Sequence, residues 1–432
     1  MTTAVIGPAL LLALVALLLL RTHIFVAILL VSIMGLAIFH GFTLDRIGAT
    51  LTRILFRASN SWELAAVPMF VWMGEIAMRT SVIPRLFRGL SPLVRRLPGG
   101  LIQTNVIAST LFAAVSGSSA ATTATVGRVT LHELEARGFD RMLSIGSLAG
   151  AGTLGLLIPP SVMMIIYGLL AEVSILRLFA AGFVPGLMIA ALYSGYLVLR
   201  SPPNPPDDFV AGPGYVLRAL RDLLPIAVLV VSVIGAIYSG WATPSEAAAV
   251  GVLVCFALAA VMGEFSLGLI RESLAAAVPT ATMICIIVVA ASFLSTAIGF
   301  LHLPQDVATL IARLGLSSAG LLLVLALFYL LLGLLLDGIS IAVMTLPIVL
   351  PLVQAAGIDL IWFGVFLIIL VELGQMTPPI GFNLFILQSI TGMPMLDVAR
   401  AAIPFFLLML LGALLIAVFP MIALWLPGML FD

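Results

Sequence analysis

Long apolar stretches separated by short polar segments run along the whole chain of 432 residues. A helix needs about 20 apolar residues to cross the hydrocarbon core of a bilayer, and backbone polar groups in lipid must be satisfied within the segment. The pattern therefore predicts an all-α integral membrane protein. The apolar segments fall at about 4–20, 23–42, 62–79, 143–170 and 178–199, and then at about 222–240, 245–262, 275–299, 361–391 and 401–427.

Two further apolar stretches, 101–137 and 318–356, are too long for one crossing, and each has a polar break near its middle. The breaks are Ser116-Gly117-Ser118-Ser119 and Asp337-Gly338-Ile339-Ser340. A polar turn at membrane depth must be buried in protein or face a hydrated cavity. This requirement favours a re-entrant helical hairpin at each stretch. The alternative, one helix that crosses the membrane and a second that returns, fits the same lengths.

The sequence repeats itself on the two sides of a proline-rich segment that begins at Ser201. The stretch 154–160 matches 373–379, with prolines at the end of both, and the pair Gly138 and Asp140 matches Gly357 and Asp359 at the same offset. Chance similarity between apolar helices does not keep glycines and prolines in one register. The chain is therefore predicted to consist of a first repeat at 1–200, a linker at 201–221 and a second repeat at 222–432. Each repeat contains a hairpin, at about 101–137 and 318–356, and a discontinuous helix, at about 143–170 and 361–391.

With re-entrant hairpins the first half crosses the membrane five times, so the second half enters in the opposite orientation and the repeats are inverted. Arginines test this topology, because fourteen fall on one side and five on the other. The positive-inside rule places the richer side and the linker in the cytoplasm, and both termini in the periplasm. Residues 45–59 have the helical spacing of an arm lying in the membrane interface, and 264–273 are its expected mirror; a plain loop is the alternative for both.

Composition supports the membrane assignment and narrows the function. The chain is 62% hydrophobic and 9% charged, and its formal net charge of zero argues against nucleic acid as a partner. Cys255 and Cys285 lie inside apolar runs, and the four histidines lack the spacing of metal ligands. With no such cluster an enzyme is not expected, and ion-coupled solute transport is the predicted function.

Each broken helix carries a proline pair that frees backbone carbonyl oxygens. Pro159 and Pro160 cannot donate, so carbonyls one turn upstream lose their helical partners, and 374–379 repeats the arrangement with the hydroxyl of Thr377 added. Such carbonyls suit an alkali cation. An ordinary proline kink is the alternative for either helix alone. The duplication, with a polar tip in each half, favours ion binding.

Hydroxyl groups gather at the first hairpin tip. Ser116 and Ser118 are the favoured ion ligands, and Ser118, Ser119 and Thr122 are candidates for binding the substrate. Helix packing is the alternative role for small polar residues in a membrane. The tip is therefore the first candidate site.

Four other polar residues lie at membrane depth. Ser161 and Asn383 begin the half-helices that follow the two breaks, where the positive end of the helix dipole favours an anionic substrate group; Asn383 can equally join two helices. Asp337 and Glu372 are candidate coupling acids, because an ionisable group in the membrane is costly unless it is paired or functional. A neutral acid, or one satisfied by backbone donors, is the alternative for both.

Four segments together resemble the large membrane subunit, the DctM-like permease, of the tripartite ATP-independent periplasmic (TRAP) transporters. They are 116–122, 152–161, 336–347 and 377–385, and the resemblance covers essentially the full chain. It implies an elevator-type transporter of the ion transporter superfamily that imports a small organic acid by sodium symport across the bacterial inner membrane. By the resemblance, the sodium ligands are Ser116, Ser118 and the carbonyls of Gly155, Ile158 and Pro160 in one site, and Gly338, Gly374, Thr377 and Pro379 in its mirror.

The resemblance also implies two protein partners, a small membrane subunit (DctQ-like) and a periplasmic solute-binding protein (DctP-like) that captures the organic acid. Sodium is the implied coupling ion, and no organic cofactor is expected. Arg128 and the pair His132-Glu133 depart from the family pattern after the first tip, which leaves the solute open. The rival interpretation is a self-contained ion-coupled anion transporter or antiporter of the same architecture, which needs no binding protein.

Overall fold

The computed structural model describes residues 3–95, 97–201, 214–301, 303, 317–334, 336–378 and 381–431, and these residues contain helices and no strand. The first half holds α1 (Thr3–Leu19), α2 (Ile24–Met34), the π-helix η1 (Gly35–Phe39), α3 (Leu44–Ser59), α4 (Ala66–Arg79), α5 (Val82–Val94), the 3-10 helix η2 (Gly100–Ile102), α6 (Gln103–Ser116), α7 (Ser119–Ala136), α8 (Arg141–Gly152), α9 (Leu154–Leu157), α10 (Val162–Ala171) and α11 (Ile175–Arg200). The second half holds α12 (Tyr215–Tyr238), α13 (Pro244–Val261), α14 (Leu267–Phe300), α16 (Ser318–Gly333), α17 (Gly338–Ala355), α18 (Leu360–Gln375), α19 (Phe382–Thr391), α20 (Met395–Val418) and α21 (Met421–Phe431).

Six of the described helices are long and apolar enough to cross a membrane, namely α11, α12, α13, α14, α17 and α20. A seventh span forms if the bent pair 141–157 and 162–171, which meet at 42°, is taken as one crossing. Shorter apolar helices accompany them, among them α6, α16 and α18. The predicted all-α membrane fold is confirmed.

The helices form two bundles. In the first, called the scaffold here, α4 packs on α13 and α14, α5 on α12, and α2 on α14. Polar contacts tie its two halves together: the Trp72 Nε1 donates to the Ser273 Oγ at 3.1 Å, and the Ser81 backbone N–H donates to the Glu264 carboxylate at 2.8 Å. The scaffold is thus assembled from both repeats.

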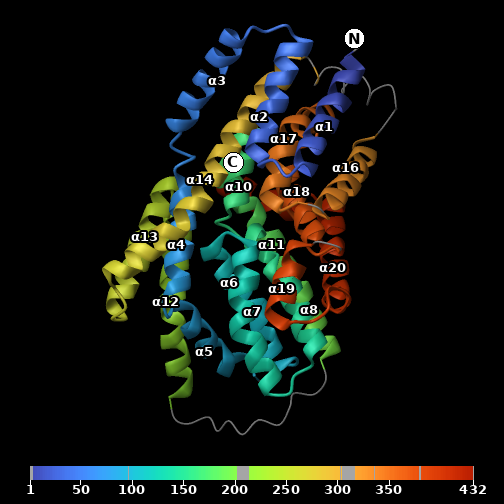
Figure 1. The fold of residues 1–432 in the computed structure, drawn as a ribbon. Helices are drawn as coiled ribbons and strands as arrows, with labels where there is room; N and C mark the ends of the chain where they lie inside the picture. The colour runs from blue at the N-terminus through green and yellow to red at the C-terminus, as the bar shows by residue number, and fades with distance from the viewer. Residues whose placement is uncertain are drawn as a thin grey trace.

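The second bundle, called the core here, contains α6 to α11 and α16 to α21. Its helices approach closely where glycines face a neighbour, as α8 does against α20. A Cβ atom at Gly146 would lie 2.1 Å from the Ala401 carbonyl oxygen, and one at Gly150 would lie 2.7 Å from the Phe405 Cβ. Small residues of this kind let membrane helices pack backbone to backbone. Figure 1 shows the core beside α4, α12 and α13 of the scaffold.

Two helical hairpins enter the core from opposite ends. Helices α6 and α7 form the first and turn at Gly117, whose φ of 56° is the left-handed conformation that favours glycine. Helices α16 and α17 form the second. In Figure 1 the first hairpin lies in the lower part of the molecule and α16 descends from the upper part. This opposed arrangement is the one expected of inverted repeats.

The repeated residues have the same local roles in both halves. Gly138 and Gly357, with φ of 74° and 69°, follow the second arm of each hairpin. Asp140 and Asp359 then cap the first helix of each broken pair, accepting from backbone N–H groups at 2.6 and 2.8 Å. Since an N-cap carboxylate satisfies helical donors that otherwise lack a partner, these positions start equivalent helices.

Three parts of the sequence prediction need correction. Helix α5 was not expected; its prolines and arginines interrupt the apolar run that identifies a span. The predicted second arm at 264–273 is no separate element, because α14 continues through it for 34 residues, about 51 Å at 1.5 Å per residue. The predicted linker at 201–221 is helical from Tyr215 onward, and residues 202–213 lie outside the described part.

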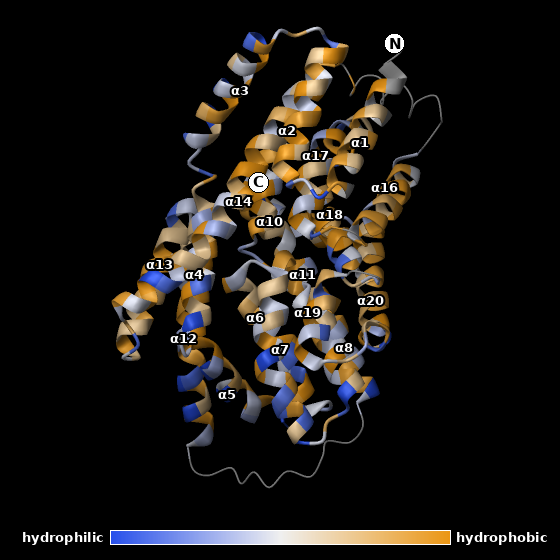
Figure 2. Cartoon of the chain, viewed as in Figure 1, coloured by the Kyte–Doolittle hydropathy of each residue, from blue (hydrophilic) through white to orange (hydrophobic). Residues whose placement is uncertain are grey.

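The predicted first arm at 45–59 is a helix, α3, that stands at the edge of the molecule (Figure 1). It is amphipathic, and Ile47, Leu51 and Ile54 pack near Phe42 and Phe293. Polar residues colour this arm and the lower ends of α7, α8 and α12 in Figure 2, while the bundle between them is largely apolar. This distribution is the one expected of a membrane protein whose apolar zone lies between two ends that face water.

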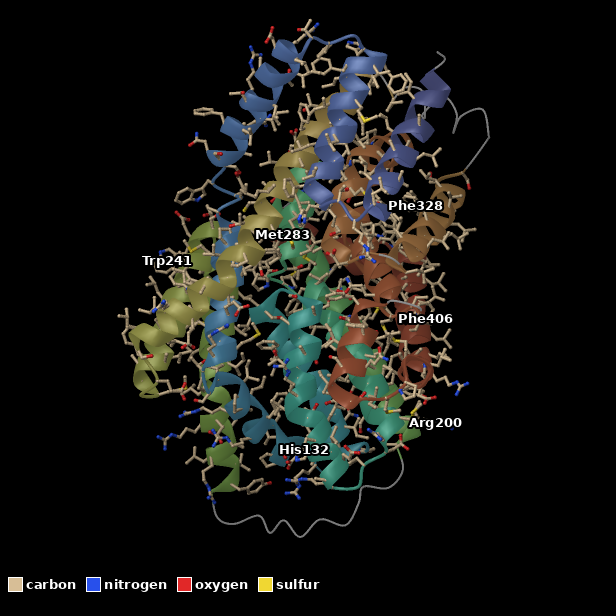
Figure 3. The ribbon with its side chains drawn as sticks, in the orientation of Figure 1. His132, Arg200, Trp241, Met283, Phe328 and Phe406 are labelled. Atoms are coloured by element: carbon tan, nitrogen blue, oxygen red, sulfur yellow. The ribbon has the colours of Figure 1, made fainter. Side chains whose placement is uncertain are left out.

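Side chains mark these zones individually in Figure 3. His132 and Arg200 lie at the same lower end, where α7 and α11 finish. Trp241, which is 82% exposed, lies on the outer face of the scaffold. Phe328 and Phe406 lie on the outer face of the core. Large apolar side chains on outer faces are what a lipid environment accommodates.

Candidate functional site

A small network of hydroxyl groups holds the first hairpin tip. The Ser116 and Thr122 hydroxyls are 2.8 Å apart, and Thr122 donates to the Ser118 carbonyl at 2.8 Å. Ser118 caps α7, its side chain accepting from the Ala121 backbone N–H. Ser116 and Thr122 are buried and Ser118 is half-buried. The tip is thus a compact turn held together by hydroxyl and carbonyl oxygens.

The first tip lies directly against the break in the first discontinuous helix. A Cβ atom at Gly155 would lie 2.5 Å from the Ser118 carbonyl oxygen, and one at Gly117 would lie 3.2 Å from the Pro160 carbonyl oxygen. Backbone meets backbone here, which only glycine permits. The structure therefore brings together Ser116, Ser118, Gly155 and Pro160, four of the five residues expected in one ion site.

The break itself follows from its proline pair. Pro159 and Pro160 have no N–H, so the Gly155 and Leu156 carbonyls lack their helical donors. Ile158 ends α9 in an extended conformation, with its side chain against Gly186 of α11. The chain becomes helical again at α10. Carbonyl oxygens are therefore available in the buried interior beside the first tip.

Ser161 caps α10, accepting from the Met164 backbone N–H at 3.4 Å, and is fully buried. This places it at the positive end of the half-helix, as predicted from sequence. The capping bond gives Ser161 a local structural role. Its side chain contacts no other predicted substrate residue through a hydrogen bond in the described part of the chain.

A carboxylate, by contrast, holds the second tip. Asp337 caps α17, accepting from the Ser340 backbone N–H at 3.2 Å and from the Ser340 hydroxyl. A Cβ atom at Gly338 would lie 2.4 Å from the amide nitrogen of the Gln375 side chain. The second tip therefore faces the second broken helix, as the first tip faces the first.

A glycine pair completes the second contact. A Cβ atom at Gly374 would lie 2.7 Å from the Gly333 Cα, so α16 and α18 touch backbone to backbone just before the tip. The Thr377 hydroxyl donates to the Leu373 carbonyl at 2.8 Å. The Gln375 and Thr377 carbonyl oxygens would lie 3.0 and 2.8 Å from a Cβ atom at Gly381. Carbonyls again gather at the break; the predicted ligand Pro379 lies outside the described residues.

One contact joins the two halves at this centre. The Ser119 hydroxyl, at the first tip, donates to the Glu372 Oε1 on α18. Glu372 is fully buried, and its Oε2 has no hydrogen-bond partner among the described residues. A buried acid with an oxygen that no described residue satisfies is costly, so Glu372 stays a candidate coupling acid. Each residue was predicted as a candidate, but their pairing was not.

Asn383, near the start of α19, is the second buried polar group with unused bonding capacity. It is fully buried, and neither its Oδ1 nor its Nδ2 has a partner among the described residues. In folded proteins such groups are normally satisfied, so an unfilled amide suits a ligand contact. No hydrogen bond joins Asn383 to Ser161, or Asp337 to Glu372, in the described chain.

Sequence reasoning missed two participants, Gln375 and Gly333. Gln375 is buried and its side-chain amide lies against the second tip. The available signal was a polar residue in an apolar helix, directly after Gly374. Gly333 gave no signal, because a glycine before a tip is indistinguishable from any other small residue until its neighbour is known.

Comparison with known proteins places this arrangement in a family. The sequence model of the family described as the tripartite ATP-independent periplasmic transporter, DctM component, matches residues 11–422. The chain is 33% identical over 379 residues to the C4-dicarboxylate TRAP transporter large permease protein DctM of Pseudomonas aeruginosa, covering 87% of this chain and 88% of that protein. It is 32% identical over 390 residues to the ectoine TRAP transporter large permease protein TeaC of Halomonas elongata, covering 88% and 90%.

A solved structure shares the fold. The crystal structure of the YdaH transporter of Alcanivorax borkumensis, described as having an unusual topology, superposes with a TM-score of 0.65 at 14% identity, over 90% of this chain and 89% of that one. At this identity the likeness concerns the fold alone. The proteins named above are transporter permeases, not enzymes. On the evidence of the family model and of these relatives, the chain belongs to the DctM component family, the large permease subunits of TRAP transporters.

Proposed function

We propose that the chain couples the entry of sodium to the import of a small organic acid. The observation that carries the proposal is the convergence of two hairpin tips on two broken helices, with Ser119 and Glu372 joining the halves. Freed carbonyls and neutral hydroxyls bind an alkali cation without burying a second full charge. The two sets of oxygens give one ion-binding region in each half.

In the first region Ser116, Ser118 and the Gly155, Ile158 and Pro160 carbonyls hold sodium. The hydroxyl network of the tip supplies the exchangeable ligands, since its bonds are internal to the turn and an ion replaces them with stronger electrostatic contacts. Bound sodium draws the tip onto the break. In the second region Gly338, Gly374, Thr377 and Pro379 have the equivalent role.

The solute binds between these regions. Ser118, Ser119 and Thr122 on one side and Ser161 and Asn383 at the half-helix starts supply hydroxyl and amide donors, and the helix dipoles favour a carboxylate. Asn383 offers buried donor capacity that no described residue uses. Relatives are named for C4-dicarboxylates and for ectoine, so the family fold accepts different small solutes. A small carboxylate is the solute class proposed for this chain.

Transport follows an elevator motion of the core against the scaffold. Contacts within each bundle are extensive, and contacts between the bundles include those of α17 and α10 with α14, of α6 with α4, α5 and α12, and of α10 with α4. A core that carries both tips and both breaks moves as a unit without dismantling the site. The scaffold remains fixed in the membrane.

The chain acts as the translocating subunit of a three-part system in the bacterial inner membrane. A small membrane subunit (DctQ-like) and a periplasmic solute-binding protein (DctP-like) complete it, in keeping with the tripartite family. The arginine distribution orients both termini to the periplasm. Cysteine labelling tests this orientation. In a cysteine-free background, a cysteine substituted for Asp208 should react only with a reagent applied from the cytoplasmic side.

Reconstitution in liposomes tests the proposal. The chain alone is expected to give no uptake, while the chain with its small subunit and loaded binding protein takes up solute only when sodium is supplied outside. Uptake that persists with potassium in place of sodium contradicts the coupling. Robust uptake of free solute by the chain alone would instead support the rival interpretation, a self-contained transporter that needs no binding protein.

A further inference from the structure

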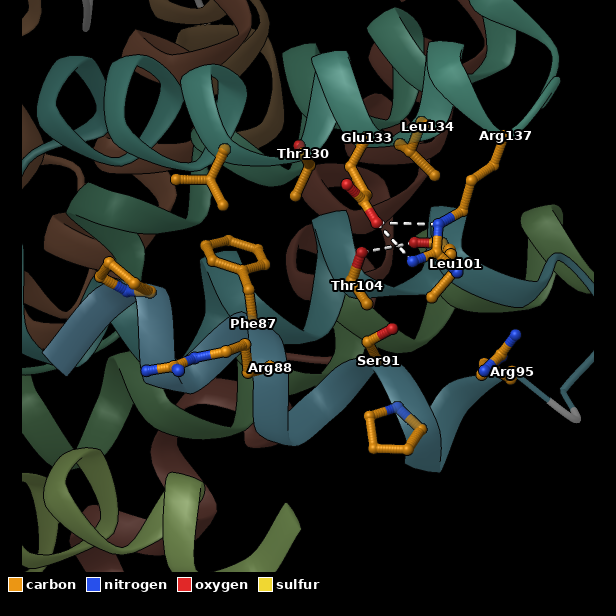
Figure 4. A pocket seen from close by; sticks show the side chains of 13 residues that line it. Phe87, Arg88, Ser91, Arg95, Leu101, Thr104, Thr130, Glu133, Leu134 and Arg137 are labelled. Atoms are coloured by element: carbon orange, nitrogen blue, oxygen red, sulfur yellow. Dashed lines mark hydrogen bonds and ion pairs between the residues drawn. The ribbon is translucent and has the colours of Figure 1, made fainter. Parts of the chain in front are cut away.

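A cavity of about 620 Å³ separates scaffold helix α5 from the arms of the first hairpin (Figure 4). One wall is formed by α5 and its C-cap residue and includes Arg88 and Arg95, and the other is formed by α7 and its C-cap residue and includes Glu133 and Arg137. The cavity lies toward the open end of the hairpin, where its α7 lining begins at Val129, whereas the tip lies at Gly117 and Ser118. It is therefore a different place from the ion and solute site.

Positive charge dominates the polar part of this cavity. Arg137 is paired, its Nε lying 2.8 Å from the Glu133 Oε1, while Arg88 is exposed and has no hydrogen bond or ion pair among the described residues. Desolvation, followed by the positive charge of Arg137, lowers the pKa of Arg95. The lining thus carries three guanidinium groups, of Arg88, Arg95 and Arg137, and one carboxylate, of Glu133. An anion in the cavity offsets this excess of positive charge.

Apart from the hydroxyls of Ser91, Thr104 and Thr130, the rest of the cavity lining is apolar. The apolar lining includes Pro84 and Phe87 of α5, Val129 and Leu134 of α7, and Leu101 of η2. Free phosphate and a small dicarboxylate have no long apolar part that could pack against such walls. A ligand with an anionic head and an apolar body matches both parts of the lining.

The surroundings indicate where this ligand comes from. The cavity lies between α5 and α7 in the lower part of the molecule, where hydrophilic residues gather (Figure 2), and this end faces the cytoplasm in the orientation proposed above. Basic pockets between membrane helices on that side suit the head groups of anionic phospholipids. We propose that this cavity binds one anionic phospholipid, with its phosphate at Arg88, Arg95 and Arg137 and an acyl chain along the apolar wall, so that the lipid bridges the scaffold and the first hairpin.

Native mass spectrometry of the delipidated chain in detergent tests this directly, and it requires no transport activity. Dioleoyl phosphatidylglycerol is the anionic probe, dioleoyl phosphatidylcholine the zwitterionic comparison and inorganic phosphate the free anion. Arg88→Gln is expected to weaken phosphatidylglycerol binding about fivefold, the effect of one arginine near an anionic surface. Arg88→Lys should retain binding. Arg128→Gln, an exposed arginine of α7 outside this cavity, is the matched control and should also retain it.

Three results would overturn the proposal: equal affinity for phosphatidylcholine, equal weakening by Arg128→Gln, or displacement of the lipid by an equal concentration of inorganic phosphate. If Arg88→Gln fails to fold by size-exclusion chromatography, Ser91→Glu serves instead. It places a second acid in the cavity lining and should weaken phosphatidylglycerol binding at least as much. Unchanged binding in that variant also overturns the proposal. A failed uptake assay leaves these outcomes untouched, so the two hypotheses are tested separately.

Discussion

The two hairpin tips occupy equivalent places in the two repeats but are held by different chemistry. Neutral hydroxyls of Ser116 and Thr122 stabilise the first tip, whereas the Asp337 carboxylate stabilises the second. The first tip touches the backbone of its broken helix at Gly155, and the second meets a side chain, that of Gln375. Duplication has preserved the contact between tip and break while the groups that make it have changed.

The difference gives the two halves unequal shares of charge. Both acids at membrane depth, Asp337 and Glu372, belong to the second half, and Glu372 reaches across to Ser119 of the first. The proposed ligands of the first half are therefore uncharged oxygens, whereas the proposed site of the second half also contains carboxylates. Inverted repeats of this kind need not bind ions with equal affinity, and mutations in the two halves should differ in effect.

The largest effect is expected at the backbone contact of the first tip. Gly155→Val places a branched side chain where even a Cβ atom lies 2.5 Å from the Ser118 carbonyl oxygen, so the tip must move. Overpacking of this kind costs about 3 kcal/mol of stability, and uptake should be abolished. Thermal unfolding and liposome uptake measure the two effects. Gly195→Val is the control, because a Cβ atom at Gly195 has no neighbour within 4 Å; equal loss in both variants would refute the contact's importance.

Removing the hydroxyl partner of each acid compares the tips directly. Ser119→Ala leaves both oxygens of a buried Glu372 without a partner and should reduce the free energy of unfolding by about 1–3 kcal/mol. Ser340→Ala should cost less, because the Ser340 backbone N–H still donates to Asp337 at 3.2 Å. Denaturation of both variants in one detergent ranks them. A larger loss of unfolding free energy for Ser340→Ala would contradict the expectation that Glu372 depends more on its hydroxyl partner than Asp337 does.

Sodium affinity separates ion ligands from packing hydroxyls. Ser118→Ala and Thr377→Val each remove one proposed ligand, worth about 1–3 kcal/mol, and should raise the sodium concentration for half-maximal uptake by about fivefold to over a hundredfold. The side-chain cap of Ser118 on α7 adds a stability loss that Thr377→Val does not share. Uptake is therefore measured against sodium at matched protein levels. An unchanged sodium curve in both variants would assign these hydroxyls to packing.

The smallest effect is expected from a neutral cap at the second tip. Asp337→Asn should change the free energy of unfolding by only a few tenths of a kcal/mol, because asparagine caps helices about as well as aspartate, while Asp337→Ala should lose about 1 kcal/mol. Thermal unfolding checks both. With the fold intact, loss of uptake in Asp337→Asn identifies the charge as part of coupling. Equal destabilisation by both substitutions would mean that the carboxylate stabilises the protein in some way other than by capping α17.

Sequence alone determined the membrane-embedded, all-helical character, the two hairpin tips and the first helix break, while the division into two repeats stays a prediction. These features follow from local chemistry: apolar runs of spanning length, prolines that cannot donate, and glycines that accept positive φ. The matched pairs Gly138 with Asp140 and Gly357 with Asp359 kept their roles as turn and cap. Helix α5 escaped notice because its mixed composition carries no spanning signal.

Only the tertiary structure decided which candidates meet. Ser119 and Glu372 lie more than half the chain apart, and nothing local indicates that one hydroxyl faces one acid. The contact of Gly374 with Gly333 and the place of Gln375 likewise depend on how two helices cross, which distant packing sets. The charged cavity beside α5 exists because two bundles approach without closing. The residue types at the candidate site could thus be predicted from the sequence, whereas the contacts between them could be identified only from the tertiary structure.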